Sequence, residues 1–254
     1  MSRAVFGCLV ATALVLAPAF RLAGLDLRPM HHDEANQAVK FGMLLETGEY
    51  KYDRNDHHGP TLYYLTLPSA WIRGQTTLAS LDERTLRVVP AIFGAGLILL
   101  LSLLAGALGR TAVAASALLT ALSPALTYYS RFYIQESLFV FFALGFLIAL
   151  GRCLQRPGAG WAISAGIAAG LAYATKETSV IVLPAVVAAA ALAWIWTGPA
   201  RSADPRSRAL GIGAATRQGA LAAGVAARGG YVALGLLGAL LVALLLYSSF
   251  FRYP

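Results

Sequence analysis

Charged residues are scarce in this sequence. Only 13% of its 254 residues are Asp, Glu, Lys or Arg, whereas about 25% is usual in soluble domains. Apolar residues make up 58%, and the mean hydropathy is +0.65. This composition argues against a soluble domain and predicts a helical protein that crosses a membrane several times.

Cysteine pairs and nucleotide-binding motifs are also missing. The two cysteines, Cys8 and Cys153, lie in or beside apolar segments, without metal-site spacing and without a disulfide framework. The sequence has no Walker loop and no strand-linked GxGxxG motif. Ser130 and Ser137 have no visible base partner for a catalytic triad. The sequence therefore gives no signal for nucleotide-dependent or serine-hydrolase chemistry.

Long apolar runs dominate what is present. Each is near the roughly 20 residues that cross a bilayer, although the third and fifth are short. Because more runs follow the first, we interpret the first as an uncleaved signal anchor. The runs occupy residues 4–25, 88–108, 112–129, 134–151, 160–175, 178–197 and 231–250. They predict an all-α polytopic membrane protein with about seven transmembrane helices, folded as a single module over residues 1–254.

The basic residues indicate the orientation of these runs. The net charge of +8 comes mainly from short connections, so membrane topology explains it better than nucleic-acid binding. The connections on one side carry Arg3, Arg110, Arg152, Arg156, Arg201, Arg206, Arg208, Arg217 and Arg228. Because cytoplasmic loops are rich in Lys and Arg, we expect a cytoplasmic N-terminus, a mobile cytoplasmic linker at 198–230, and an inner or plasma membrane location.

The large first loop, residues 26–87, then lies outside the cytoplasm. It holds all four histidines and nine of the twelve acids, and His31-His32-Asp33-Glu34 stands near its start. Apolar residues after Asp33 recur near helical spacing, which predicts an amphipathic helix over about 34–47 that lies on the outer leaflet and ends at Gly48. Asp33 is then at its N-cap or first turn. Residues 55–60 predict a turn, after which Pro60 begins a second short helix.

The candidate side chains each have two interpretations. Asp33 is either only a helix cap or, with Glu34 beside it, part of a site at the membrane face. Glu136 is either paired with Arg131 or a second acid of that site, and Lys176 with Glu177 is either an interfacial pair or part of the site. The two histidine pairs suggest a divalent metal, but adjacent residues rarely point at one ion, so hydrogen-bonding histidines remain the alternative.

Several short stretches carry a resemblance to a known family. The stretches are His31-His32-Asp33-Glu34-Ala35, His58-Gly59-Pro60-Thr61-Leu62-Tyr63-Tyr64, Tyr129-Ser130-Arg131-Phe132-Tyr133-Ile134-Gln135-Glu136 and Ala174-Thr175-Lys176-Glu177-Thr178. Together they resemble the GT-C superfamily of integral-membrane glycosyltransferases, in the branch of protein mannosyltransferases and aminoarabinose transferases. The first and last stretches look most like a bacterial and archaeal subfamily associated with flippase activity.

The resemblance implies an activity and assigns roles. Members of the family transfer a sugar from a polyprenyl-phosphate donor on the outer face to a lipid, glycan or protein acceptor. The configuration at the anomeric carbon of the sugar inverts during this transfer. By this resemblance Asp33 is the general base, and the acids Glu34 and Glu136 shape the catalytic site. The implied substrate-binding residues are Arg131, Lys176, Glu177, His58 and Tyr63. The histidine pairs themselves, and not the resemblance, suggest His31, His32 and Asp33 as ligands of a divalent metal.

One further expectation follows from the resemblance, and two other functions compete with the enzyme. Full-length members continue into more spans and a periplasmic domain, so we expect this chain to lack a C-terminal region. The alternative function is a non-catalytic accessory of lipid-linked sugar flipping or transport. A secondary transporter ranks below both, because the charges lie at span ends and no inverted repeat is visible.

Overall fold

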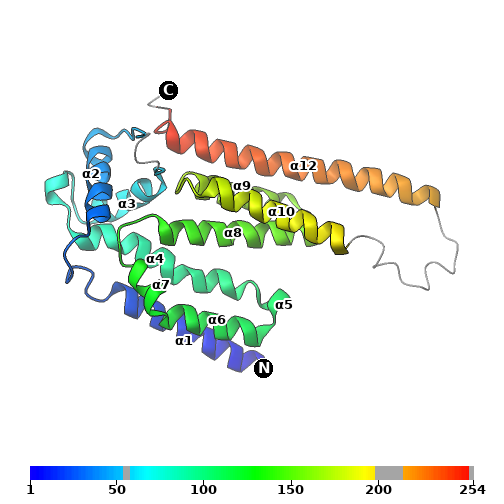
Figure 1. Cartoon of the computed structure of the whole chain (residues 1–254), viewed down its shortest axis with the longest axis horizontal. Helices are drawn as coiled ribbons and strands as arrows, with labels where there is room; N and C mark the ends of the chain where they lie inside the picture. The colour runs from blue at the N-terminus through cyan, green and yellow to red at the C-terminus, as the bar shows by residue number, and fades with distance from the viewer. Residues whose placement is uncertain (54–57, 198–213, 252–254) are drawn as a thin grey trace.

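The computed structural model describes residues 1–53, 58–197 and 214–251. Within these ranges every element is a helix, which confirms the all-α prediction (Figure 1). The elements are α1 (Arg3–Leu22), α2 (His32–Thr47), α3 (Thr61–Ile72), the short 3-10 helix η1 (Leu78–Ser80), α4 (Glu83–Ser102), α5 (Ala105–Leu108), α6 (Arg110–Leu122), α7 (Pro124–Tyr129), α8 (Glu136–Gln155), α9 (Ala159–Tyr173), α10 (Ser179–Thr197) and α12 (Ala214–Tyr247).

The apolar runs of the sequence coincide with the long helices. Among the described residues, α1, α4, α8 and the Gly229–Tyr247 part of α12 are long and apolar enough to cross a membrane. Helices α6, α9 and the Ser179–Ala189 part of α10 are apolar but shorter. The polytopic membrane class is thus confirmed, while the number of seven spans stays a prediction.

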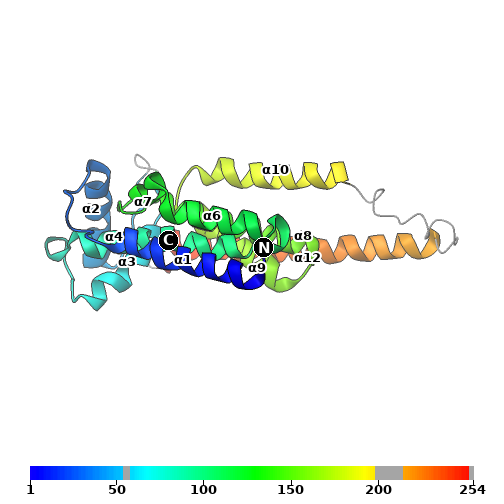
Figure 2. The same ribbon diagram turned by 90° about the horizontal axis from the view of Figure 1, so that it is seen from below.

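The long helices run side by side, and the acid-rich loop lies at one end of them. Helix α1 packs on α4 and α6, α4 on α8, α8 on α9, and α9 on α12. Helices α2 and α3 lie at one end of this bundle, beside the start of α4, and α2 is steeply inclined to its long axis in both views (Figures 1 and 2). The start of α8, the α9–α10 turn and the end of α12 lie at the same end.

Capping residues define both ends of helix α2. At its start, His31 is the N-cap: its Nδ1 accepts the Asp33 N–H (3.3 Å), and the Glu34 carboxylate accepts the His31 N–H (2.9 Å). This reciprocal arrangement is a capping box, and it begins the helix two residues earlier than predicted. At its end, Gly48 has a φ of 73° and its N–H donates to the Leu44 carbonyl, as expected of a glycine that stops a helix.

Helix α2 buries its apolar face against protein. Phe41 and Leu44 are 0% and 2% exposed and belong to the largest core cluster, together with Leu62, Tyr63 and Leu138 from α3 and α8. The predicted amphipathic helix is therefore confirmed, but its apolar stripe serves the protein core. Val39 and Met43 on its other side are exposed.

Two sequence-based boundaries need correction. The linker predicted at 198–230 is wrong for residues 214–230, which belong to α12, because a stretch rich in alanine favours helix even when it contains glycine. The predicted run 112–129 is two helices, α6 and α7: Ser123 caps α7, and Pro124 occupies its first position. The predicted turn at 55–57 and the linker residues 198–213 lie outside the described residues.

Candidate active site

A buried ion pair joins α2 to α4. Glu34 and Arg87 have side chains that are 0% and 1% exposed. The guanidinium binds the carboxylate with both of its edge nitrogens, Nε to Oε1 at 2.7 Å and Nη2 to Oε2 at 3.0 Å. Arg87 also donates to the carbonyls of Leu25 (2.6 Å), Arg28 (2.9 Å) and Pro29 (3.3 Å). One arginine thus ties the chain between α1 and α2 to the first turns of α4.

Three more donors complete the surroundings of Glu34. The Arg28 guanidinium donates to Oε2 at 3.1 Å, and the backbone N–H groups of His31 and Tyr133 donate at 2.9 Å each. Burial opposes ionisation of this carboxyl, but the hydrogen bonds from Arg87, His31 and Tyr133 outweigh it and hold the pKa of Glu34 below its ordinary value. With five hydrogen bonds around its two oxygens, Glu34 holds the loop together and has no oxygen to offer a substrate.

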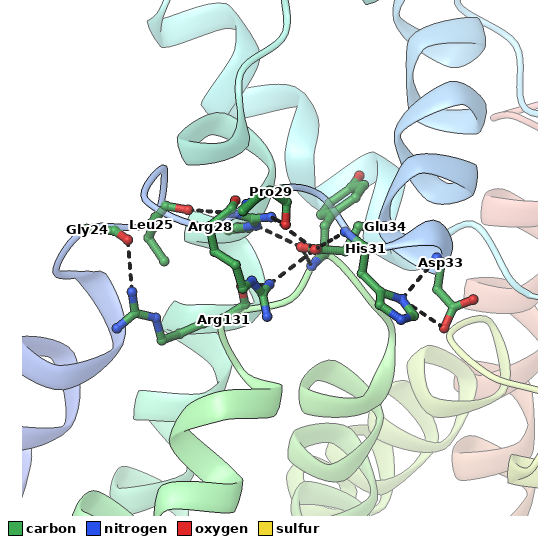
Figure 3. Close-up of polar contacts among 10 residues, drawn as sticks. Gly24, Leu25, Arg28, Pro29, His31, Asp33, Glu34 and Arg131 are labelled. Carbon is green, nitrogen blue, oxygen red and sulfur yellow. Dashed lines mark hydrogen bonds and ion pairs between the residues drawn. The ribbon is translucent and has the colours of Figure 1, made fainter.

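Asp33 lies beside Glu34 in sequence but faces away from it (Figure 3). Its side chain is 65% exposed, and its nearest charged partner is His31, with Nδ1 3.5 Å from Oδ2. The same nitrogen accepts the Asp33 N–H at 3.3 Å. Asp33 therefore presents an ionisable carboxylate to the outside, in the first turn of α2, where the helix dipole favours negative charge.

The other predicted acids are each paired. Glu136, at the start of α8, binds the Lys176 ammonium at 2.7 Å through Oε1, so the alternative that pairs it with Arg131 is wrong. Glu177 lies 3.1 Å from the Nδ1 of His58. The structure thus brings together Lys176 with Glu136 and His58 with Glu177, all at the end of the bundle that carries Asp33.

Close backbone packing positions His58. The Gly59 N–H donates to the Thr175 carbonyl (3.3 Å), and the Thr61 N–H donates to the Ala174 carbonyl (3.1 Å). A Cβ added at Gly59 would lie 2.1 Å from that Ala174 oxygen, so only glycine fits this crossing. The contact joins the loop before α3 to the turn between α9 and α10.

Two predicted substrate-binding residues have structural contacts instead. Arg131 donates to the carbonyls of Phe20 (3.0 Å) and Gly24 (2.9 Å), where α1 ends. Tyr63 is fully buried, and its hydroxyl donates to the Gln37 side chain. These contacts satisfy the last carbonyls of a helix and a buried amide, and Tyr63 faces no open site because it is fully buried.

The predicted metal ligands do not converge. His31 faces Asp33, whereas the His32 ring faces Asn36, 3.4 Å from its side-chain nitrogen. Within the described ranges, no group of three His, Cys, Asp or Glu side chains is placed to hold an ion. The prediction fails here because neighbouring positions on a helix point about 100° apart, and these residues do not fit a three-ligand site.

Reasoning from the sequence missed Arg87 and Arg28. In the sequence, Arg87 is only one of several cations in the outer loop. It stands, however, in the first turns of a long apolar helix, and an ionisable residue in such a position usually has a partner. Arg28 lies over the Phe132 ring, with Cζ 3.4 Å from its centroid, which gives it a cation–π contact. No sequence signal pointed to that contact.

Comparison with known proteins identifies the family behind this arrangement. Residues 65–204 match the family model of the dolichyl-phosphate-mannose-protein mannosyltransferases. The chain belongs to this family. Membership confirms the resemblance to GT-C glycosyltransferases and the multi-pass membrane class. No curated protein matches the chain.

A solved structure shows the same fold. The chain is similar to the S. cerevisiae protein O-mannosyltransferase Pmt1-Pmt2 complex bound to the sugar donor, with a TM-score of 0.68 at 18% sequence identity. The match covers 99% of this chain and 34% of the yeast chain. This member of the family thus spans about a third of the length of the yeast protein that it matches.

Proposed function

We propose that this chain carries the catalytic loop of a membrane glycosyltransferase. The enzyme moves a sugar from a polyprenyl-phosphate donor to an acceptor hydroxyl outside the cytoplasm. The family match supports glycosyl transfer, and the similar yeast complex is bound to its sugar donor. The observation that carries the assignment here is Asp33, whose exposed carboxylate has no Arg or Lys partner among the described residues.

Asp33 acts as the general base in this proposal. It takes the proton of the acceptor hydroxyl while the hydroxyl oxygen bonds to the anomeric carbon of the sugar. The bond from that carbon to the phosphate oxygen breaks on the opposite face, so the configuration inverts and polyprenyl phosphate leaves. A carboxylate suits this role when it is ionised and within hydrogen-bond reach of the hydroxyl.

Lys176 is the cation best suited to receive the leaving phosphate. Its side chain is 18% exposed, and its ammonium binds a single carboxylate oxygen of Glu136, whereas the Nη1 and Nη2 atoms of Arg131 bind backbone carbonyls. A positive charge at the phosphate stabilises the charge that develops there in the transition state. Glu136 and Glu177 hold Lys176 and His58 in position beside it.

An apolar cavity offers room for the donor's hydrocarbon chain. It measures about 1050 Å³ and lies between α8, α9, α10 and α12. Its walls include Phe146, Leu150, Tyr173 and Leu183, and Tyr173 stands three residues before Lys176. A polyprenyl chain in this cavity would bring its phosphate toward the lysine.

The test compares transfer by wild-type protein and Asp33→Asn. Membranes that contain the full-length protein receive radiolabelled polyprenyl-phosphate sugars, and label in any acceptor is counted. Loss of the base should lower the transfer rate by about 10²–10⁴-fold at equal protein level. Glu49→Gln, a change of another acid in the same loop, is the matched control and should transfer normally.

Two other outcomes would each refute part of the proposal. Equal transfer by Asp33→Asn and wild type would remove Asp33 from the mechanism. Wild-type protein that transfers none of the polyprenyl-phosphate sugars would favour the accessory function in lipid-linked sugar flipping or transport.

The orientation is a separate part of the proposal. The distribution of basic residues supports a cytoplasmic N-terminus, which puts the 26–87 loop outside. Thr76 is exposed in this loop, so Thr76→Cys in a Cys8→Ser, Cys153→Ser background should react with a membrane-impermeant thiol reagent in intact cells. Labelling that occurs only after lysis would reverse the orientation and move the site to the other face.

A further inference from the structure

A second, smaller cavity lies between α1, α4, α7 and α8. It measures about 230 Å³, which is room for several water molecules at about 30 Å³ each. Its lining includes Arg21, Leu97, Leu126, Glu136, Ser137 and Val140. None of the steps proposed for sugar transfer takes place in it.

Arg21 brings an unused hydrogen-bond donor to this cavity. The side chain is 0% exposed, and its two terminal nitrogens donate to the carbonyls of Ala17 and Ala121 (3.3 Å each) and Thr120 (2.8 Å). Its Nε is buried and has no acceptor. A buried donor without a partner is costly, so this N–H indicates a ligand that accepts a hydrogen bond.

Glu136 brings an unused acceptor to the same cavity. Its Oε1 binds Lys176, but its Oε2 is buried and receives no hydrogen bond. Arg21 and Glu136 both line the cavity but do not form an ion pair with each other. A ligand that satisfies both side chains must accept from Arg21 and donate to Glu136. A hydroxyl group does both.

The charges and the rim narrow the class of ligand. The charged side chains that line the cavity are one cation, Arg21, and one anion, Glu136, so a head group of either sign would meet a like charge. The rim is apolar and open: Leu126 and Val140 are 43% and 47% exposed and belong to helices α7 and α8. Two buried polar atoms in an otherwise apolar lining match an amphiphile in the membrane better than a water-soluble molecule.

We propose that this cavity binds the hydroxyl-bearing head group of an uncharged membrane lipid, of the diacylglycerol type. The hydroxyl oxygen accepts the Arg21 Nε–H, the hydroxyl donates its hydrogen bond to Glu136 Oε2, and the acyl chains leave past Leu126 and Val140. This binding site goes beyond the proposed sugar transfer and does not depend on Asp33.

The experiment uses the whole chain in phosphatidylcholine nanodiscs. The probe is a diacylglycerol with a photoreactive diazirine in one acyl chain, and the labelled peptides are identified by mass spectrometry. We expect saturable labelling of α7 and α8. Unlabelled diacylglycerol should compete, whereas the same lipid with its hydroxyl acetylated should not.

A rim variant keeps the test independent of folding. Val140→Trp fills the opening without touching the Arg21 contacts, so it should weaken probe binding and lower specific labelling by about tenfold or more. Val15→Trp, an equally large change at an exposed position of α1, should label normally. Arg21→Met should also lose labelling, and Val140→Trp decides the question if that variant fails to fold.

Three results would overturn the proposal. They are labelling that does not saturate, equal competition by the acetylated lipid, and no effect of Val140→Trp. If Val140→Trp has no effect, the cavity holds only water. Asp33→Asn should bind the probe like wild type, so failure of this site and failure of the proposed transfer are separate results.

Discussion

Asp33 and Glu34 are neighbours with opposite surroundings. The Asp33 side chain is 65% exposed and faces a single histidine, whereas the Glu34 side chain is 0% exposed and accepts five hydrogen bonds. One step along a helix turns a side chain by about 100°, so the capping box that draws Glu34 inward directs Asp33 outward. An acidic pair in a sequence is therefore not one functional unit: here one acid holds the loop together and its neighbour presents an exposed carboxylate.

The largest expected effect is on stability, through the buried acid. Glu34→Ala leaves the Arg87 charge buried without an anion, and breaking such a pair costs about 3–5 kcal/mol. Asp33→Ala removes an exposed carboxylate and should change the free energy of unfolding by no more than about 0.5 kcal/mol. Thermal unfolding of both variants in one detergent measures the difference. Similar losses of stability in the two variants would contradict the different structural roles of Glu34 and Asp33.

Acid should weaken the protein through Glu34. Its folded-state pKa lies below the ordinary value of 4.5, so its stabilising contribution is complete above that pH and is lost as the pH falls toward the folded pKa. The thermal midpoint of wild type should therefore decline through this window. In Glu34→Gln the thermal midpoint should decline less steeply. Some decline should remain, because the pKa of Asp82 is also lowered in the folded state. An unchanged slope would mean that other carboxyls govern the acid response.

The smallest effect is expected at an exposed ion pair of the same loop. Asp26 and Arg84 lie 2.9 Å apart with side chains 37% and 57% exposed. Exposed pairs contribute little because water and salt screen them, so Asp26→Asn should leave the thermal midpoint unchanged within error. A clear drop in the midpoint would show that surface charges in this loop matter as much as the buried pair.

Local patterns in the sequence predicted most of the fold. Apolar runs located the long helices, Gly48 marked the end of α2, and Pro60 marked the start of α3, because each of these signals acts within a few residues. The boundary of α12 was missed because alanine and glycine in residues 214–230 carry conflicting local preferences. The tertiary environment of such a segment determines whether it forms a helix.

The site was predicted less completely because its contacts are long-range. The sequence placed Asp33 at the N-cap or in the first turn of a helix, and it placed Glu136, Lys176 and Glu177 near the membrane face on the outer side. It did not indicate that Glu34 binds Arg87, 53 residues later, or that Arg131 binds the end of α1, more than 100 residues earlier. Charge and spacing do not specify which cation meets which anion across a fold.

The contacts of Arg21 have a consequence for biosynthesis. Its carbonyl partners Thr120 and Ala121 follow it by 99 and 100 residues. At about 5–20 residues per second, the ribosome needs about 5–20 s to make them after Arg21 is complete. During this interval the first helix carries a guanidinium that lacks most of its final partners. Stable insertion of the first span therefore depends on α6. A chain that ends before α6 should be degraded as an incompletely folded membrane protein.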